Sequence, residues 1–267
     1  MSERIKRTFE KKEKKLVTFT TGGDPDLETS FSILKTIISN KIDIVEIGMP
    51  FSDPMADGPT IQESSTRSIE NGTIINDIFE LAKKIRSLNN EIPIILMGYY
   101  NSIFNMGIEE FTSKCAEVGV DGLIIVDLQP EEDDELFLKT KEHNIDLIRL
   151  ITPTTDKERL RTILNKASGF LYYVTITGIT GQNSANLKEL ESSINLIRSE
   201  SNLPIVAGFG IKSRKDVENI STFTDGVVVG SSIVNIIKDN ISNKKSMLEK
   251  IDLFTKDLKK GTVSWIG

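Results

Sequence analysis

The stretch GLIIVDLQPEEDDELFLKTKEHNIDLIRLI, residues 122–151, holds one complete unit of the pattern that decides the fold. It opens with the apolar run Gly122–Val126 and closes with a second run, Asp146–Ile151. Between them, residues 131–143 carry the spacing of an amphipathic helix. Runs that stay apolar at successive positions are typical of strands buried on both faces, as in a parallel sheet covered by helices. The stretch therefore predicts a strand, a helix and a second strand parallel to the first.

The same unit recurs along the whole chain. Further strands are expected at Leu16–Thr20, Ile42–Ile47, Ile92–Gly98, Phe170–Val174, Pro204–Ala207 and Gly226–Val229. Further helical patterns lie at Glu28–Asn40, Thr73–Leu88, Ile108–Val118, Asp156–Lys166 and Asn186–Glu200. Eight such units in 267 residues match the count and size of a (β/α)₈ barrel. We therefore predict that residues 1–267 form a single α/β domain, a (β/α)₈ TIM barrel, with an additional helix before the first strand.

An open, doubly wound sheet is the rival architecture for alternating strands and helices. Such a fold usually carries a Gly-x-Gly-x-x-Gly turn after its first strand. The first turn here reads TGGDP, residues 21–25, which lacks that spacing. No linker or low-complexity tract divides the sequence into two domains. The barrel is therefore the favoured architecture.

Charge and cysteine content limit the classes of partner and site. The net charge of −6 argues against non-specific nucleic-acid binding, which needs a basic face. Cys115 and His143 are the single cysteine and histidine, so we expect neither an internal disulfide nor a Cys/His metal site. The sequence has no apolar run of about 18 residues, the length needed for a membrane-spanning helix. Its charged N-terminus, with the basic run 11–15, is interpreted as a solvated helix. We expect a cytoplasmic protein with no membrane or nucleic-acid partner.

Glycine-rich turns follow the last three predicted strands. They read TGITG at 177–181, GFGI at 208–211 and GSSI at 230–233. In a barrel the active site lies at the C-terminal ends of the strands, and the loops after strands seven and eight often bind phosphate. The last turn also opens a helix, whose N-terminal N–H groups favour an anion. Any one of these turns could simply be a tight connection, but the three together favour a phosphate site.

Glu46 lies near the end of the second predicted strand. Strand alternation places it on the same face as Ile44 and on the face opposite Val45 and Ile47. If that face is the barrel interior, burial raises the pKa of the carboxyl group, which can then exchange protons near neutral pH. The alternative is an outward Glu46 paired with a lysine on a helix. The sequence leaves these two arrangements open.

Asp57 follows in the segment EIGMPFSDPMADGPTI, residues 46–61, beyond an expected bend at Pro54. The bend can bring the chain back over the barrel mouth, where a carboxylate would bond an N–H group or stabilise a developing cation. Asp-Pro and Asp-Gly pairs also form turns without any chemistry, so this position too stays open. No predicted strand ends in a lysine, which a Schiff-base aldolase would need. Carboxylates are therefore the available acid/base groups.

Several of these segments together resemble the tryptophan synthase alpha chain family. Residues 46–61 are similar to that family's active-site signature nearly residue for residue, and the likeness covers almost the whole chain in order. The other similar segments are TTGGDP at 20–25, MGYYN at 97–101, VDLQPEE at 126–132, residues 172–181, GFGI at 208–211 and GS at 230–231. The resemblance implies a (β/α)₈ barrel that reversibly cleaves indole-3-glycerol phosphate to indole and glyceraldehyde 3-phosphate, in tryptophan biosynthesis.

The resemblance also implies which residues act. Glu46 would be the catalytic acid/base, and Asp57 would engage the indole N–H. The remaining implied substrate-binding residues fall into three groups. Phe19 and Tyr172 would flank the indole ring, with Tyr99 and Leu96 or Leu123 as further residues of the pocket wall. Gly181, Gly210, Gly230 and Ser231 would bind the phosphate. Thr180 would orient Asp57 when the loop that carries Thr180 closes.

A partner is implied as well. Members of the family join a pyridoxal-phosphate-dependent beta chain in an α₂β₂ complex, so Asp53 and its loop would face that chain, and this chain would need no metal or organic cofactor. Three alternatives remain. A sugar-phosphate isomerase barrel would explain the glycine turns but not Glu46, Asp57 and the aromatic wall, and a non-catalytic regulatory subunit would need none of them. An alpha chain that works without a beta chain is a third possibility.

Overall fold

The computed structural model describes residues 1–174, 184–208 and 210–263. Its strands are parallel and form one sheet in the order β5-β4-β3-β2-β1-β9-β8-β7-β6. They are β1 (Lys15–Thr21), β2 (Ile44–Gly48), β3 (Ile94–Gly98), β4 (Gly122–Ile125), β5 (Asp146–Leu147), β6 (Arg149–Ile151), β7 (Leu171–Val174), β8 (Ile205–Gly208) and β9 (Gly226–Val229). A strand is present at every predicted position.

The predicted strand at Asp146–Ile151 is divided into two segments. β5 pairs with β4, whereas β6 pairs with β7, where Arg149 lies opposite Leu171. Between the two segments, the N–H of Ile148 donates to the carbonyl oxygen of Leu123 at 2.9 Å. One interrupted strand thus joins both ends of the sheet. The nine strand segments therefore make the eight-stranded barrel that the sequence predicted.

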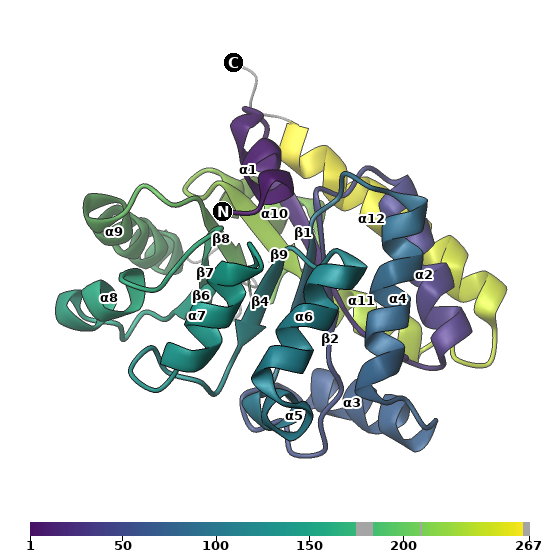
Figure 1. The fold of residues 1–267 in the computed structure, drawn as a ribbon. Coiled ribbons are helices and arrows are strands. Elements are labelled where there is room, and N and C mark those ends of the chain that lie inside the picture. The colour runs from purple at the N-terminus through teal and green to yellow at the C-terminus, as the bar shows by residue number, and fades with distance from the viewer. Residues whose placement is uncertain (175–183, 209, 264–267) are drawn as a thin grey trace.

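Helices surround the sheet on its outside (Figure 1). Those at predicted positions are α2 (Leu27–Ser39), α4 (Ile75–Leu88), α6 (Ile108–Val118), α7 (Asp134–Glu142), α8 (Lys157–Leu164) and α9 (Ser184–Glu200). The others are α1 (Glu3–Glu10), α3 (Pro59–Glu70), α5 (Tyr100–Met106), α10 (Arg214–Ser221), α11 (Ser231–Lys238) and α12 (Lys244–Val263). Within the described part of the chain, none of these helices combines the length and the apolar character needed to cross a membrane.

Helix α2 shows why a helix forms and packs where it does. The side chain of Asp26 accepts a hydrogen bond from the N–H of Thr29 at 2.8 Å, which satisfies one of the free N–H groups of the first turn. Ile33, Leu34 and Ile37 share one face and are buried. Burying each of these side chains contributes about 1.5–3 kcal/mol, so the apolar stripe holds the helix on the sheet.

The inward faces of the strands form a core of their own. This core contains Ile5 of α1 and one residue from or beside each of the eight strands: Val17, Ile44, Ile95, Ile124, Ile148, Phe170, Val206 and Val228. Val45 and Ile47 belong to a second core that also includes side chains of the surrounding helices. The prediction that Ile44 faces away from Val45 and Ile47 is confirmed.

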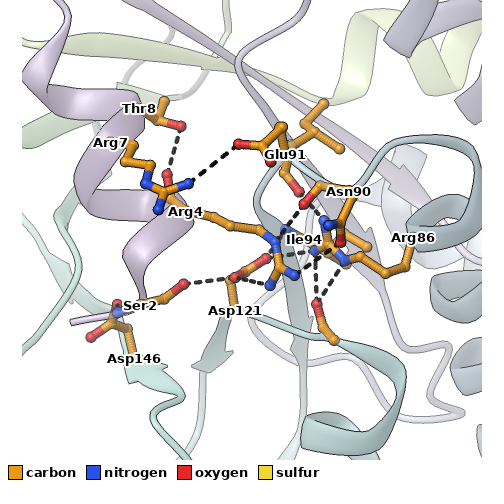
Figure 2. A network of polar contacts seen from close by, with 12 residues as sticks. Ser2, Arg4, Arg7, Thr8, Arg86, Asn90, Glu91, Ile94, Asp121 and Asp146 are labelled. Carbon is orange, nitrogen blue, oxygen red and sulfur yellow. Dashed lines mark hydrogen bonds and ion pairs between the residues drawn. The ribbon is translucent and has the colours of Figure 1, made fainter.

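Helix α1 covers the end of the barrel at which the strands begin. Figure 2 shows how the buried Asp121, just before β4, holds it in place. Ser2 Oγ and Arg4 Nη1 donate to Asp121 Oδ1 at 2.6 and 3.1 Å, and Arg86 Nη2 donates to Oδ2 at 2.7 Å. The additional helix is therefore confirmed. Helices α3 and α5 lie at the opposite end of the barrel (Figure 1).

The basic run at residues 11–15 does not continue this helix, contrary to the interpretation from sequence. α1 ends at Glu10, and Lys15 is the first residue of β1 and only 1% exposed. Its ammonium group donates to the carbonyl oxygens of Lys11, at 2.8 Å, and Glu13. Lys15 is buried because β1 begins here to pair with β9, where it lies opposite Gly226.

Candidate functional site

A cavity of ≈ 360 Å³ lies where the barrel strands end. Residues of β1, β3, β6, β7, β8 and β9 line it, together with the loop before α3 and the turns before α10 and α11. Much of its wall is apolar and includes Met97, Val126, Leu150, Val174 and Val228. This is the end of the barrel at which the sequence predicted the active site.

Glu46 points into the barrel on β2, between Phe19 of β1 and Ile95 of β3 in the strand register. It is 1% exposed, and neither of its carboxyl oxygens has a hydrogen-bond partner among the described residues. Burial, with a further contribution from the nearby charge of Asp57, raises the pKa of Glu46 to about 8. The sequence left the inward and outward orientations of Glu46 open, and the structure shows the inward one. Glu46 is thus a carboxyl group that holds its proton at neutral pH.

The loop after β2 returns Asp57 to the cavity. The N–H of Asp57 donates to the carbonyl oxygen of Pro54 at 3.0 Å, which closes the bend expected at that proline. Gln62 Nε2 then donates to the Asp57 carbonyl oxygen at 2.9 Å, and α3 begins at Pro59, two residues on. Asp57 lines the cavity wall. The sequence left its position open, and the structure places it over the barrel mouth.

Tyr99 fixes the carboxylate of Asp57. Its hydroxyl donates to Asp57 Oδ2 at 2.9 Å and accepts from the N–H of Ala56 at 2.9 Å. The ring stacks on Phe51, with centroids 5.0 Å apart. Burial raises the pKa of Asp57, and the hydrogen bond from Tyr99 lowers it. Tyr99 faces only a small side cavity of ≈ 10 Å³ beside Asp57, so it supports the carboxylate instead of forming a wall of the main cavity.

Hydrogen bonds hold helix α3 in place and so help to fix the segment that carries Asp57. Arg67 Nε and Nη2 donate to the two carboxylate oxygens of the buried Asp24, each at 2.8 Å. Ser68 Oγ donates to the carbonyl oxygen of Gly22 at 2.7 Å. These bonds tie α3 to the loop after β1, so the position of Asp57 depends on two β/α loops.

Phe19 and Tyr172 form aromatic parts of the cavity wall, and their predicted role of flanking an indole ring stays a prediction. Glycines leave room for both rings. A Cβ atom at Gly48 would lie 2.6 Å from Phe19 Cζ, and one at Gly208 would lie 2.7 Å from the Tyr172 hydroxyl. Such distances are impossible without movement, so these glycines provide space for the rings.

Leu96 and Leu123 do not belong to the wall. Both are fully buried in the core between strands and helices. Alternation along β3 gives the physical reason, because Ile95 and Met97 point into the barrel and Leu96 must therefore point out.

The turns after β8 and β9 form the polar end of the cavity. Gly210, Gly230 and Ser231 line it, and Gly210 has a φ of +71°, which favours glycine. α11 begins at Ser231, and no side chain caps its first turn. Ser232 Oγ donates to the carbonyl oxygen of Ile211 at 2.7 Å, which joins the two turns. The first N–H groups of α11 are therefore available to an anion in the cavity.

Two of the predicted binding residues, Thr180 and Gly181, lie outside the described residues, as does the whole TGITG turn. Their predicted roles stay predictions. Lys212 is a lining residue that the sequence reasoning missed. It directly follows the GFGI turn at 208–211, so extending that turn by one residue would have found it.

Comparisons with known proteins match nearly the whole chain. The family model described as tryptophan synthase alpha chain matches residues 5–263. The tryptophan synthase alpha chain of Petrotoga mobilis is 42% identical over 93% of this chain and 96% of its own length. That of Zymomonas mobilis is also 42% identical, over 96% of this chain and 94% of its own.

Solved structures give the same result. The crystal structure of tryptophan synthase subunit alpha from Legionella pneumophila superposes with a TM-score of 0.90 at 34% identity, covering 98% of both chains. The matched range includes the described site residues, from Phe19 to Ser231. From the family match and the identity over nearly its full length, this chain belongs to the tryptophan synthase alpha chain family.

Proposed function

We propose that this protein is a carbon–carbon lyase that reversibly cleaves indole-3-glycerol phosphate to indole and glyceraldehyde 3-phosphate. One observation carries the proposal. A proton-bearing Glu46 lies buried on the inward face of β2, close enough to Asp57 for their charges to interact, and Asp57 lines a cavity that the uncapped start of α11 also lines. Membership of the tryptophan synthase alpha chain family supports it.

The cavity matches the substrate in its chemistry from end to end. Phe19 and Tyr172 offer aromatic faces for a flat indole ring. Asp57 can accept a hydrogen bond from the indole N–H, and the start of α11 can bind the phosphate through its N–H groups. A substrate that spans these groups would place its reacting carbon near the inward face of β2, where Glu46 lies.

Glu46 alone can carry out both proton transfers of the reaction. Protonated Glu46 gives its proton to C3 of the indole ring, which becomes an indolenine cation stabilised by Asp57. The Glu46 carboxylate then takes the proton of the hydroxyl group on the carbon attached to C3. The O–H electron pair forms the aldehyde, the C–C bond breaks, and its electron pair restores neutral indole. Glu46 ends protonated, as it began.

We propose that this reaction needs no cofactor in this chain, because the protonated indole ring accepts the electron pair of the breaking bond. Pyridoxal phosphate would belong to a beta-chain partner. Met55 and Phe104 are 82% and 69% exposed, and both lie on segments held by the Phe51–Tyr99 stack and the Tyr100–Phe104 ring contact. Exposed apolar side chains of this kind are typical of a partner contact. We propose that a beta chain binds here, next to Asp53, in an α₂β₂ complex.

The test is release of indole from indole-3-glycerol phosphate by the purified chain, with and without a tryptophan synthase beta chain. We expect turnover by the chain alone and stimulation by the partner. Isomerisation of a triose phosphate without indole release would identify a sugar-phosphate isomerase. Absence of both reactions, with activation of the beta chain, would identify a regulatory subunit. Turnover that the beta chain neither raises nor lowers would indicate an enzyme that works alone.

Replacing Tyr99 with Phe is expected to move the acidic limb of the pH profile of kcat/KM upward. The Tyr99 hydroxyl donates to Asp57 Oδ2, and this bond lowers the pKa of Asp57. Without the bond the pKa of Asp57 rises, so a higher pH is needed to ionise it. Tyr100→Phe is the matched control, because Tyr100 packs against Phe104 outside the cavity. An unchanged acidic limb in Tyr99→Phe would contradict the assignment.

A further inference from the structure

The charges in the cavity wall are few and lie on different elements. Among the described residues that line the cavity, Asp57 is the one acid and Lys212 the one base. Asp57 belongs to the loop between β2 and α3, whereas Lys212 lies between β8 and α10. The remaining described lining residues are apolar or neutral. A ligand in this cavity therefore meets one negative and one positive side chain.

The backbone of Lys212 is held next to the start of α11. Its N–H donates to Asp216 Oδ2 at 3.0 Å, and the same carboxylate accepts from the N–H of Ser213 at 2.9 Å in a capping box. On the other side, Ser232 Oγ bonds the carbonyl oxygen of Ile211 at 2.7 Å. The Cα of Lys212 is thus fixed between the capped α10 and the uncapped α11.

The ammonium group of Lys212 is available for a ligand. No hydrogen bond or ion pair joins it to another described residue. The nearby carboxylate of Asp216 is already engaged, because it accepts the backbone N–H groups of Lys212 and Ser213 and caps α10. The side chain is exposed along a cavity in a protein of net charge −6. An uncompensated cation at this place favours an anionic ligand group.

We propose that Lys212 binds the phosphate group of the substrate and thereby sets which end of the substrate enters each end of the cavity. The identity of the substrate rests on the proposed function; the anion site itself does not. Backbone N–H groups at a helix start carry only partial charges, whereas an ammonium group brings a full positive charge to a phosphate dianion. Asp57 repels the same dianion. The two side chains together therefore orient the substrate with its ring toward Asp57 and its phosphate toward α11.

The experiment uses the synthetic direction, in which indole and glyceraldehyde 3-phosphate are separate molecules. Lys212→Met should raise KM for glyceraldehyde 3-phosphate by about fivefold, the size expected for a partly exposed charge pair with phosphate. KM for indole and kcat should change less than about twofold, because indole carries no phosphate. Lys212→Arg should keep most of the affinity, and raising the salt concentration should shrink the difference between wild type and Lys212→Met. Lys215→Met is the matched control, an exposed lysine in the first turn of α10 that does not line the cavity.

A second measurement separates this inference from the proposed function. Binding of inorganic phosphate is titrated by ³¹P NMR for wild type, Lys212→Met and Lys215→Met, without any turnover. Weaker phosphate binding in Lys212→Met alone supports the site, even if the wild type releases no indole and the proposed reaction is wrong. Equal phosphate binding and an unchanged KM for glyceraldehyde 3-phosphate in Lys212→Met would overturn the inference. An equal loss in Lys215→Met would also overturn it, because the effect would then be general surface charge.

Discussion

Replacing Glu46 with Gln is expected to lower kcat for indole-3-glycerol phosphate cleavage by about 10²–10⁴-fold, the usual contribution of a positioned general acid/base. Gln has nearly the same size and is uncharged, like the protonated Glu46 of the folded protein at neutral pH. Substrate binding should therefore be retained. The amide can neither give a proton to indole C3 nor take one from the hydroxyl. Steady-state release of indole measures kcat, and Glu63→Gln on α3, whose carboxylate forms an exposed ion pair with Lys238, is the matched control.

The free energy of unfolding of Glu46→Gln should depend on pH less than that of the wild type. The pKa of Glu46 is about 8 in the folded protein and near its ordinary value of 4.5 in the unfolded chain. The folded state therefore binds the proton more tightly, and the free energy of unfolding falls as pH rises from 4.5 through 8. The loss is on the order of 3–5 kcal/mol when Glu46 is fully ionised. Gln does not ionise, so Glu46→Gln should be close to wild type at pH 5 and more stable than wild type at pH 9.

Urea unfolding at pH 5, 7 and 9 checks the stability effect, and the alkaline limb of kcat/KM checks the catalytic one. Activity of the wild type should fall as Glu46 loses its proton near pH 8. Full turnover in Glu46→Gln would contradict the assignment of Glu46 as the general acid/base. A wild-type stability that does not fall between pH 5 and pH 9 would show that Glu46 is not held neutral by burial.

Replacing Asp57 with Asn is expected to lower kcat by about 10²–10³-fold, the effect of removing one preorganised group that stabilises transition-state charge. Asn keeps the shape of the side chain, and its carbonyl oxygen can still accept the hydrogen bond of Tyr99. It lacks the negative charge that stabilises the indolenine cation, so the loss should appear in kcat more than in KM. The acidic limb of the pH profile should also disappear, because the group that must ionise is gone.

Asp239→Asn at the far end of α11 provides the matched control, since Asp239 is exposed and does not line the cavity. Pre-steady-state measurement separates chemistry from product release. If Asp57→Asn raises KM and leaves kcat intact, Asp57 binds the ring without stabilising charge, and the proposed electrostatic role is wrong.

Much of the architecture was predictable because strands and helices leave local periodic signals. Eight apolar runs separated by helical patterns predicted the barrel, and strand alternation predicted that Glu46 shares a face with Ile44, opposite Val45. The basic run at residues 11–15 was misinterpreted, because its burial depends on where β1 must begin to pair with β9. The division of the fifth strand at Ile148 could not be predicted from the sequence either, because it arises only when the barrel closes.

Some features of the candidate site follow from the sequence, and others depend on the tertiary structure. The sequence by itself determined that Glu46 shares a face with Ile44, that the chain bends at Pro54 and that glycine turns follow the last strands, because each depends on neighbours along the chain. Only the tertiary structure decided that the face of Ile44 and Glu46 is the inner one, that Tyr99 bonds Asp57, and that Lys212 lines the cavity beside α11. The physical reason is distance along the chain. A period of two or 3.6 residues fixes the face of a side chain, whereas its partners across strands are set by closure of the sheet and packing of loops far apart in sequence.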